Sequence, residues 1–235
     1  MGRHRLEETG HCFDREGCLR CLRCAENCPT GALEAVGREM SVEEVLAEVL
    51  QDAVFYESSG GGLTLSGGEP MAQWDFSRAL LRAAKEKGLH TCLETCGYAP
   101  WESFSQSLGL VDLYLYDYKI GDPELHRKYT GVDNAVILEN LSKLDEAGAA
   151  TVLRCPVIPG INDTPEHFAC IARTANALKH LREVHVEPYH PMGGDKAKRL
   201  GEEYPLTSLG FPSEEQVKAW LETLQGLIGV EVRRP

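Results

Sequence analysis

The stretch Leu63–Pro70 reads LTLSGGEP, and it indicates how the rest of the chain folds. Its leucines alternate with polar residues, which is typical of a half-buried strand. Two glycines, a carboxylate and a proline then end the strand abruptly. Because Gly67 and Gly68 have no side chains, a small molecule can lie against the main chain there while Glu69 accepts a hydrogen bond from an ammonium group. The stretch therefore predicts a strand with a binding site at its carboxyl end.

Strand and helix patterns alternate along the rest of the chain. Five more strands are expected at Leu89–Glu94, Val111–Tyr118, Thr151–Val157, Glu183–Pro188 and Val230–Arg233. Helices are expected after the capping box Ser41–Glu44, after Pro100, and at Phe76–Lys87, Ala135–Ala147, Pro165–Leu181 and Glu214–Leu227. Such alternation predicts a parallel sheet with helices outside it, as an open sheet or as a full or partial barrel. Neither G-x-G-x-x-G nor G-x-x-x-x-G-K-[ST] occurs, so the sequence supports neither a dinucleotide fold nor a P-loop.

Ionisable residues cluster where the expected strands end. In parallel α/β folds the site lies at the carboxyl ends of the strands. Each residue also has a simpler interpretation, such as a surface ion pair or an exposed imidazole. Asp117 and Lys119 are two residues apart, so they share one face of their strand. The residues at the strand ends are Glu69, Glu94, Asp117, Lys119, Arg154 and His190.

Cysteines are frequent in this chain, and five of the nine lie between Cys12 and Cys28. The run CLRCLRCAENCP has the spacing C-x2-C-x2-C-x3-C-P, which predicts a [4Fe-4S] cluster on Cys18, Cys21, Cys24 and Cys28. A zinc site is the alternative, although zinc motifs usually place a longer spacer between two C-x2-C pairs. In two-cluster ferredoxins the fourth cysteine of such a run serves the other cluster. Cys12 is therefore an alternative fourth ligand.

Composition narrows the class of protein. The chain has 235 residues, 43% hydrophobic and 26% charged, as is usual for a globular protein with a substantial core. Its net charge is -12 and no block of Lys and Arg occurs, which argues against a nucleic-acid partner. No secretory signal and no long apolar run is present, so we expect no membrane segment and a cytoplasmic location.

The cysteine run and the Gly-Gly-Glu strand end together resemble the radical SAM superfamily. The closer resemblance is to activating enzymes of glycyl radical enzymes, the relatives of pyruvate formate-lyase activating enzyme that carry a ferredoxin-like insert. It extends from about Phe13 to Pro235 through FDREGC, FYESSGGGLTLSGGEP, TCLETCGY, DLYLYDYK, RCPVIPGIND and EPYHPMG. The resemblance implies a ferredoxin-like [4Fe-4S] segment at residues 1–37. It also implies a partial (β/α) barrel of the radical SAM type at residues 38–235.

The resemblance also implies a ligand, a reaction and partners. The ligand would be S-adenosylmethionine (SAM), with a monovalent cation beside Glu94 and Asp117. In the implied reaction, one-electron cleavage of SAM gives a 5'-deoxyadenosyl radical that takes hydrogen from a glycine of a partner glycyl radical enzyme. The electron donor would be a flavodoxin or ferredoxin. Gly67, Gly68 and Glu69 would hold the SAM ammonium and Lys119 its carboxylate, in a pocket also lined by Glu94, Asp117 and His190.

One family motif does not occur in this sequence. The C-x3-C-x2-C loop, whose three thiolates leave one iron open to SAM, is absent, and no residue is assigned a catalytic role. We expect that the first strand and this loop are missing. The chain alone would then bind at most one cluster, hold SAM weakly and form no 5'-deoxyadenosine with dithionite. One alternative is a non-catalytic iron–sulfur module for electron transfer or partner binding. Another is that Cys18, Cys21 and Cys24 form a shortened version of the loop.

Overall fold

The computed structural model describes residues 2–8, 10–206 and 208–235. They form two compact units, Met1–Ser41 with Met192–Thr207, and Val42–Pro191 with Ser208–Pro235. The first unit includes a segment from late in the chain, which the sequence did not suggest. The division into a ferredoxin-like segment at 1–37 and a core at 38–235 stays a prediction.

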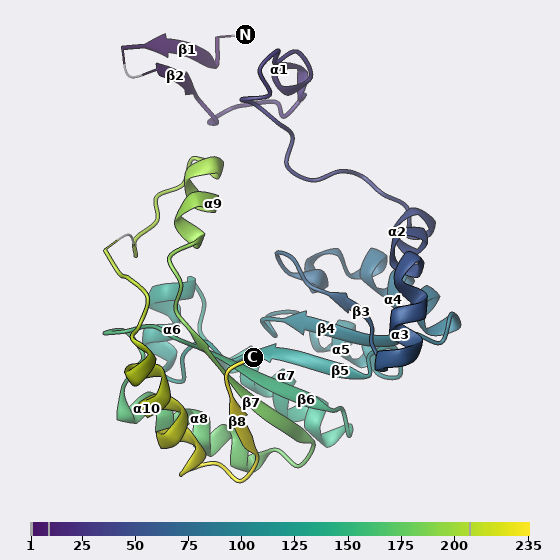
Figure 1. The fold of residues 1–235 in the computed structure, drawn as a ribbon, viewed down its shortest axis with the longest axis vertical. Coiled ribbons are helices and arrows are strands. Elements are labelled where there is room, and N and C mark those ends of the chain that lie inside the picture. The colour runs from purple at the N-terminus through teal and green to yellow at the C-terminus, as the bar shows by residue number, and fades with distance from the viewer. Residues whose placement is uncertain (1, 9, 207) are drawn as a thin grey trace. The chain divides into compact units, whose positions relative to one another are not determined.

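The larger unit is built on a parallel sheet of six strands in chain order (Figure 1). Each strand is hydrogen-bonded to the next in sequence, so helices occupy the crossovers between neighbours. This confirms the expected parallel α/β fold with helices outside the sheet. The strands are β3 (Gly62–Leu65), β4 (His90–Thr95), β5 (Leu113–Asp117), β6 (Thr151–Val157), β7 (Leu181–Pro188) and β8 (Glu231–Arg233).

Helices of this unit pack against the sheet through one main core, beside a second, smaller cluster of Leu63, Leu80, Ala84 and Leu89. That core joins buried residues of the strands, such as Leu93, Tyr116 and Leu153, to residues of five helices, such as Leu141. The helices are α2 (Val42–Val49), α3 (Ala53–Ser59), α4 (Trp74–Glu86), α5 (Trp101–Ser107), α6 (Pro123–Thr130), α7 (Ala135–Glu146), α8 (Pro165–Ala177) and α10 (Glu214–Gln225), with short 3-10 turns η1 (Leu50–Asp52) and η2 (Pro70–Gln73). No helix of the described residues has the length and apolar character needed to span a membrane.

The two faces of the sheet differ in burial. In β4, Leu93 and Thr95 are fully buried while Glu94 between them is half-buried. In β5, Tyr116 is buried while Asp117 is half-buried. Since successive side chains of a strand point to opposite faces, the helices cover one face and the polar residues share the other.

The smaller unit contains an antiparallel hairpin, the cysteine run and one helix from late in the chain. The hairpin is β1 (His4–Glu7) with β2 (Gly10–Phe13), and α1 (Arg23–Glu26) is a single turn inside the cysteine run. Helix α9 (Gly193–Leu200) belongs to the same unit, where Arg199 contacts Glu34 and its carbonyl accepts a hydrogen bond from Arg15 at 2.6 Å.

Most predicted elements occur within a few residues of their expected bounds. The box at Ser213 and Gln216 starts α10 as predicted, with both reciprocal hydrogen bonds present. The helix expected at Pro165–Leu181 is too long, because Leu178 is already extended and Leu181 pairs with Thr151 in the sheet. The β1–β2 hairpin, α6 and α9 were not predicted.

A buried histidine makes the stability of the fold depend on pH. His167 in α8 is buried, its Nδ1 accepts a hydrogen bond from Gly121 at 3.3 Å, and its Nε2 has no partner among the described residues. Burial lowers the pKa of His167 to about 4. The unfolded chain protonates this group near pH 6.5, so stability is complete above that pH and falls as the pH drops toward 4.

We expect the free energy of unfolding to fall by about 2 kcal/mol more in the wild type than in His167→Leu between pH 7 and pH 5. Urea unfolding followed by circular dichroism at both pH values measures this difference. Equal losses in the two proteins would show that His167 is not the group responsible.

Candidate functional site

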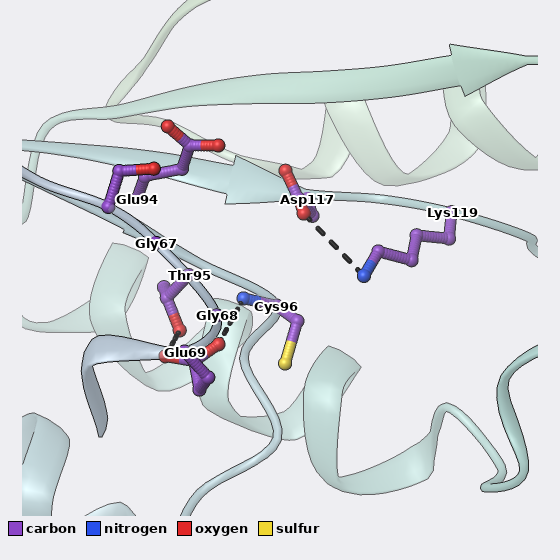
Figure 2. Close-up of a pocket in the computed structure, with 9 residues that line it drawn as sticks. Gly67, Gly68, Glu69, Glu94, Thr95, Cys96, Asp117 and Lys119 are labelled. Atoms are coloured by element: carbon purple, nitrogen blue, oxygen red, sulfur yellow. Dashed lines mark hydrogen bonds and ion pairs between the residues drawn. The ribbon is translucent and has the colours of Figure 1, made fainter. Parts of the chain in front are cut away.

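A pocket of about 280 Å³ opens at the carboxyl ends of β3, β4 and β5 (Figure 2). The loops that follow parallel strands meet at this edge of the sheet, and the pocket is where they meet. Three carboxylates and one ammonium line it, with two glycines between them. Its lining residues are Ser66, Gly67, Gly68, Glu69, Glu94, Thr95, Cys96, Asp117 and Lys119.

The two glycines leave space above the main chain. Gly67 has φ +124°, a conformation that residues with side chains rarely adopt. A Cβ atom built on Gly67 or Gly68 would meet nothing within 4 Å. The main chain here is therefore open to a ligand, as the sequence predicted.

Glu69 ties the loop after β3 to the end of β4. Its Oε1 accepts hydrogen bonds from the Met71 backbone N–H at 3.0 Å and the Thr95 hydroxyl at 2.9 Å, and its Oε2 accepts from the Cys96 backbone N–H at 2.8 Å. Figure 2 shows these three pocket residues, Glu69, Thr95 and Cys96, gathered on one side of the pocket. A carboxylate has about four acceptor positions, so one remains for a ligand. Glu69 therefore shapes the pocket in addition to its predicted role of binding an ammonium.

On the other side of the pocket the charges are paired across three strands. Lys119 Nζ lies 3.6 Å from Asp117 Oδ2, and Arg154 contacts Glu94 and lies 4.0 Å from Asp117 Oδ1. Burial raises the pKa of the Asp117 carboxyl, and Lys119 and Arg154 oppose that rise. The pocket lining holds more carboxylates than cations, so it favours a ligand that carries positive charge.

A buried amide, Asn162, and a half-buried thiol, Cys96, complete the surroundings. The Asn162 amide donates to the carbonyls of Lys119 at 3.0 Å and Pro156 at 2.8 Å, which fixes the loops after β5 and β6. Burial raises the pKa of the Cys96 thiol, and the neighbouring Glu69 carboxylate raises it further. Cys96 is therefore a neutral thiol at neutral pH.

The structure brings together six of the seven predicted ligand-binding residues. Thr95, at the end of the same expected strand as Glu94, also lines the pocket, whereas Ser66 and Cys96 were missed although they are neighbours of predicted residues. His190 follows β7, is exposed and does not line this pocket. Its place in the site stays a prediction.

The expected monovalent cation also stays a prediction. Its two predicted ligands, Glu94 and Asp117, already have Arg154 beside them. No group of three His, Cys, Asp or Glu side chains that could hold a metal ion occurs in the described part of the chain.

The cysteine run forms one tightly wound loop in the smaller unit. Arg20 and Leu22 have φ of +51° and +59°, left-handed values that bend the chain between the cysteines. The backbone N–H of Arg20 donates to Cys18 Sγ and that of Leu33 to Cys28 Sγ, both at 3.4 Å. Those bonds suit a [4Fe-4S] cluster, whose potential depends on hydrogen bonds to its sulfurs. Each thiolate of such a cluster binds a different iron, so its ligands surround the cluster and need not converge on one ion.

Known proteins resemble this chain over most of its length. Residues 18–170 match the radical SAM superfamily. The isethionate sulfite-lyase activating enzyme of Oleidesulfovibrio alaskensis is 45% identical over 223 residues, covering 94% of this chain and 71% of that protein. The trans-4-hydroxy-L-proline dehydratase activating enzyme of Clostridioides difficile is 39% identical, covering 90% and 70%. Pyruvate formate-lyase 2-activating enzyme of Escherichia coli is 34% identical, covering 87% and 70%.

Solved structures agree in fold. A domain of pyruvate-formate lyase-activating enzyme from Bacteroides vulgatus superposes with a TM-score of 0.62 at 25% identity, covering 74% of this chain and 99% of that one. A radical SAM methyltransferase from Sphaerobacter thermophilus gives 0.58 at 20% identity, covering 88% and 61%.

Proposed function

This chain belongs to the radical SAM superfamily, among the activating enzymes of glycyl radical enzymes, and we propose that its strand-end pocket binds the methionine part of SAM. The charge of the pocket supports this proposal most directly. SAM carries a carboxylate, an ammonium and a sulfonium close together. Its two positive groups suit a lining with three carboxylates, and its one negative group suits Lys119.

Six of the pocket residues have a defined role in this proposal. Lys119 pairs with the ligand carboxylate. Asp117, Glu94 and the remaining acceptor position of Glu69 receive the ammonium, together with the main chain at Gly67 and Gly68. Because Gly67 leaves open space above it, the ligand can approach the backbone closely. His190 is proposed as a further residue of the SAM site.

A [4Fe-4S] cluster on Cys18, Cys21, Cys24 and Cys28 would complete the cofactors. Radical SAM enzymes use such clusters with SAM, and a bound cluster supplies single electrons at low potential. The chain's own contribution is the thiol spacing and the N–H donors to Cys18 and Cys28. A flavodoxin or ferredoxin is the proposed electron donor.

The proposed protein partner is a glycyl radical enzyme, from one glycine of which hydrogen is removed. The similar proteins above are named as activators of a sulfite-lyase, a dehydratase and a formate-lyase. Activating enzymes of this class act on a glycyl radical enzyme, and we extend that class of partner to this chain.

Calorimetric titration with SAM and with S-adenosylhomocysteine tests the pocket assignment. The second ligand has the same amino-acid part but lacks the positive sulfonium. We expect both to bind, with SAM binding about 10-fold more tightly because the pocket favours positive charge. If neither SAM nor S-adenosylhomocysteine binds, the proposal is overturned.

A second function is favoured by one observation, the absence of C-x3-C-x2-C from this sequence. The chain would then be an iron–sulfur module for electron transfer or partner binding. Chromatographic detection of 5'-deoxyadenosine after reduction with dithionite separates the two functions. Its formation supports the activating function and would show that Cys18, Cys21 and Cys24 leave one iron open. Tight binding of a glycyl radical enzyme without 5'-deoxyadenosine supports the second function.

A further inference from the structure

Arg154 lies beside three carboxylates on the polar face of the sheet. Its Nε donates to Glu187 Oε1 at 2.5 Å and its Nη2 donates to Glu187 Oε2 at 2.8 Å. Its Nη1 contacts Glu94 and lies 4.0 Å from Asp117. The guanidinium therefore joins a residue outside the pocket lining, Glu187, to two residues inside it.

The contact with Glu187 fixes the direction of the other side of Arg154. A guanidinium is planar and rigid, so a carboxylate that occupies the Nε and Nη2 edge determines where Nη1 points. Glu187 is itself held in place, because strand β7 pairs with β6 and Glu187 is the register partner of Pro156. Both side chains are only about a quarter exposed, at 21% for Arg154 and 26% for Glu187. Contacts between partly buried charges are screened less by water and salt than contacts at the surface.

The same contact also preserves the negative charge of the pocket. Arg154 brings one positive charge to the wall formed by Glu94 and Asp117. Glu187 supplies a carboxylate that offsets this charge from the side away from the ligand. Without Glu187, the guanidinium would lose its bidentate partner and would pair more fully with Glu94 and Asp117.

We propose that Glu187 is a positioning residue for SAM binding, which acts through Arg154 to keep Glu94 and Asp117 oriented toward the ligand. This inference rests on the proposed function of the pocket. Glu187 does not line the pocket and need not touch the ligand. Its proposed role differs from that of a residue that only joins β6 to β7, because its removal is expected to change ligand affinity.

Calorimetric titration of the full chain with SAM tests the proposal. We expect Glu187→Gln to weaken binding about 10-fold, since one face of a charge-assisted bidentate pair is lost. Glu183→Gln is a matched control on the same strand. Glu183 also pairs with an arginine, Arg233, at 2.6 Å, and its side chain is 30% exposed, but neither residue lines the pocket. The control is expected to leave the dissociation constant unchanged.

A double-mutant cycle distinguishes positioning from general destabilisation. If Glu187 acts through Arg154, then Glu187→Gln has no further effect on SAM affinity in an Arg154→Met background. A further 10-fold loss there would overturn the proposal. Arg154→Lys provides an independent check, because lysine cannot reproduce the bidentate contact and is expected to weaken binding to a similar extent.

The possible outcomes separate this inference from the function on which it rests. If the wild type does not bind SAM, the proposed function fails. If the wild type binds SAM and Glu187→Gln binds it equally well, only the positioning role fails. If Glu187→Gln does not fold, the SAM affinity of Arg154→Lys is compared with that of the wild type. Equal affinity in these two proteins would overturn the positioning role.

Discussion

A Cys28→Ala variant is expected to lose its iron–sulfur cluster, whereas Cys12→Ala is expected to keep it. The pKa of Cys28 is lowered. The largest cause is the hydrogen bond that the Leu33 N–H donates to Cys28 Sγ, and the second is the Thr30 hydroxyl, 3.7 Å from the same sulfur. The pKa of Cys12 is raised, most strongly by a hydrogen bond with Glu7. Because the thiolate is the form that binds metal and Cys28 completes the C-x2-C-x2-C-x3-C spacing, we expect Cys28 to be the fourth ligand.

Iron content and EPR spectra after anaerobic reconstitution measure this difference. The wild type and Cys12→Ala are expected to hold about four iron atoms per chain, and Cys28→Ala fewer than about one. The reverse pattern would assign the fourth position to Cys12. If both variants and the Cys12→Ala/Cys28→Ala double variant keep the full cluster, three cysteines suffice. SAM should then alter the EPR spectrum, because only an open iron can bind it.

Replacing Lys119 by Met is expected to weaken SAM binding about 100-fold. In the proposed complex the ammonium of Lys119 pairs with the ligand carboxylate. Its removal also leaves that carboxylate facing Glu69, Glu94 and Asp117 without the one cation of the described pocket lining. The loss therefore combines a missing charge-assisted hydrogen bond with repulsion between like charges.

Lys143→Met provides the control for this variant. Lys143 pairs with Glu139 one turn away on α7 and does not line the pocket, so its loss is expected to leave SAM affinity unchanged. Isothermal titration calorimetry with SAM, at one salt concentration, measures the affinities of the wild type, Lys119→Met and Lys143→Met. Equal affinity in Lys119→Met and the wild type would show that the ligand carboxylate lies elsewhere.

The sequence predicted the larger unit well, because its signals are local. Alternating apolar residues, glycines after helices and the box at Ser213 each depend on a few neighbouring residues, and the six strands appear within a few residues of their expected bounds. Where a local signal predicted the wrong element, contacts between residues distant in sequence determined the secondary structure. Leu181 continues an apolar helical pattern, yet it begins a strand because it pairs with Thr151 across the sheet.

The pocket was predictable for a similar reason. Parallel strands in chain order place their carboxyl ends at one edge, so residues as far apart as Glu69 and Lys119 could be assigned to one site before the structure was known. The C-x2-C-x2-C-x3-C spacing predicts a cluster-binding loop in the same local way, and that assignment stays a prediction.

By itself, then, the sequence determined the order of strands and helices, the edge of the sheet where the pocket lies and most of the residues that line it. Only the tertiary structure showed that Glu69 holds Thr95 and Cys96, and that Glu187 holds Arg154 against Glu94. The physical reason is that secondary structure follows the local period of the chain. A hydrogen bond between side chains depends instead on the register, twist and rotamers of strands that are far apart in sequence.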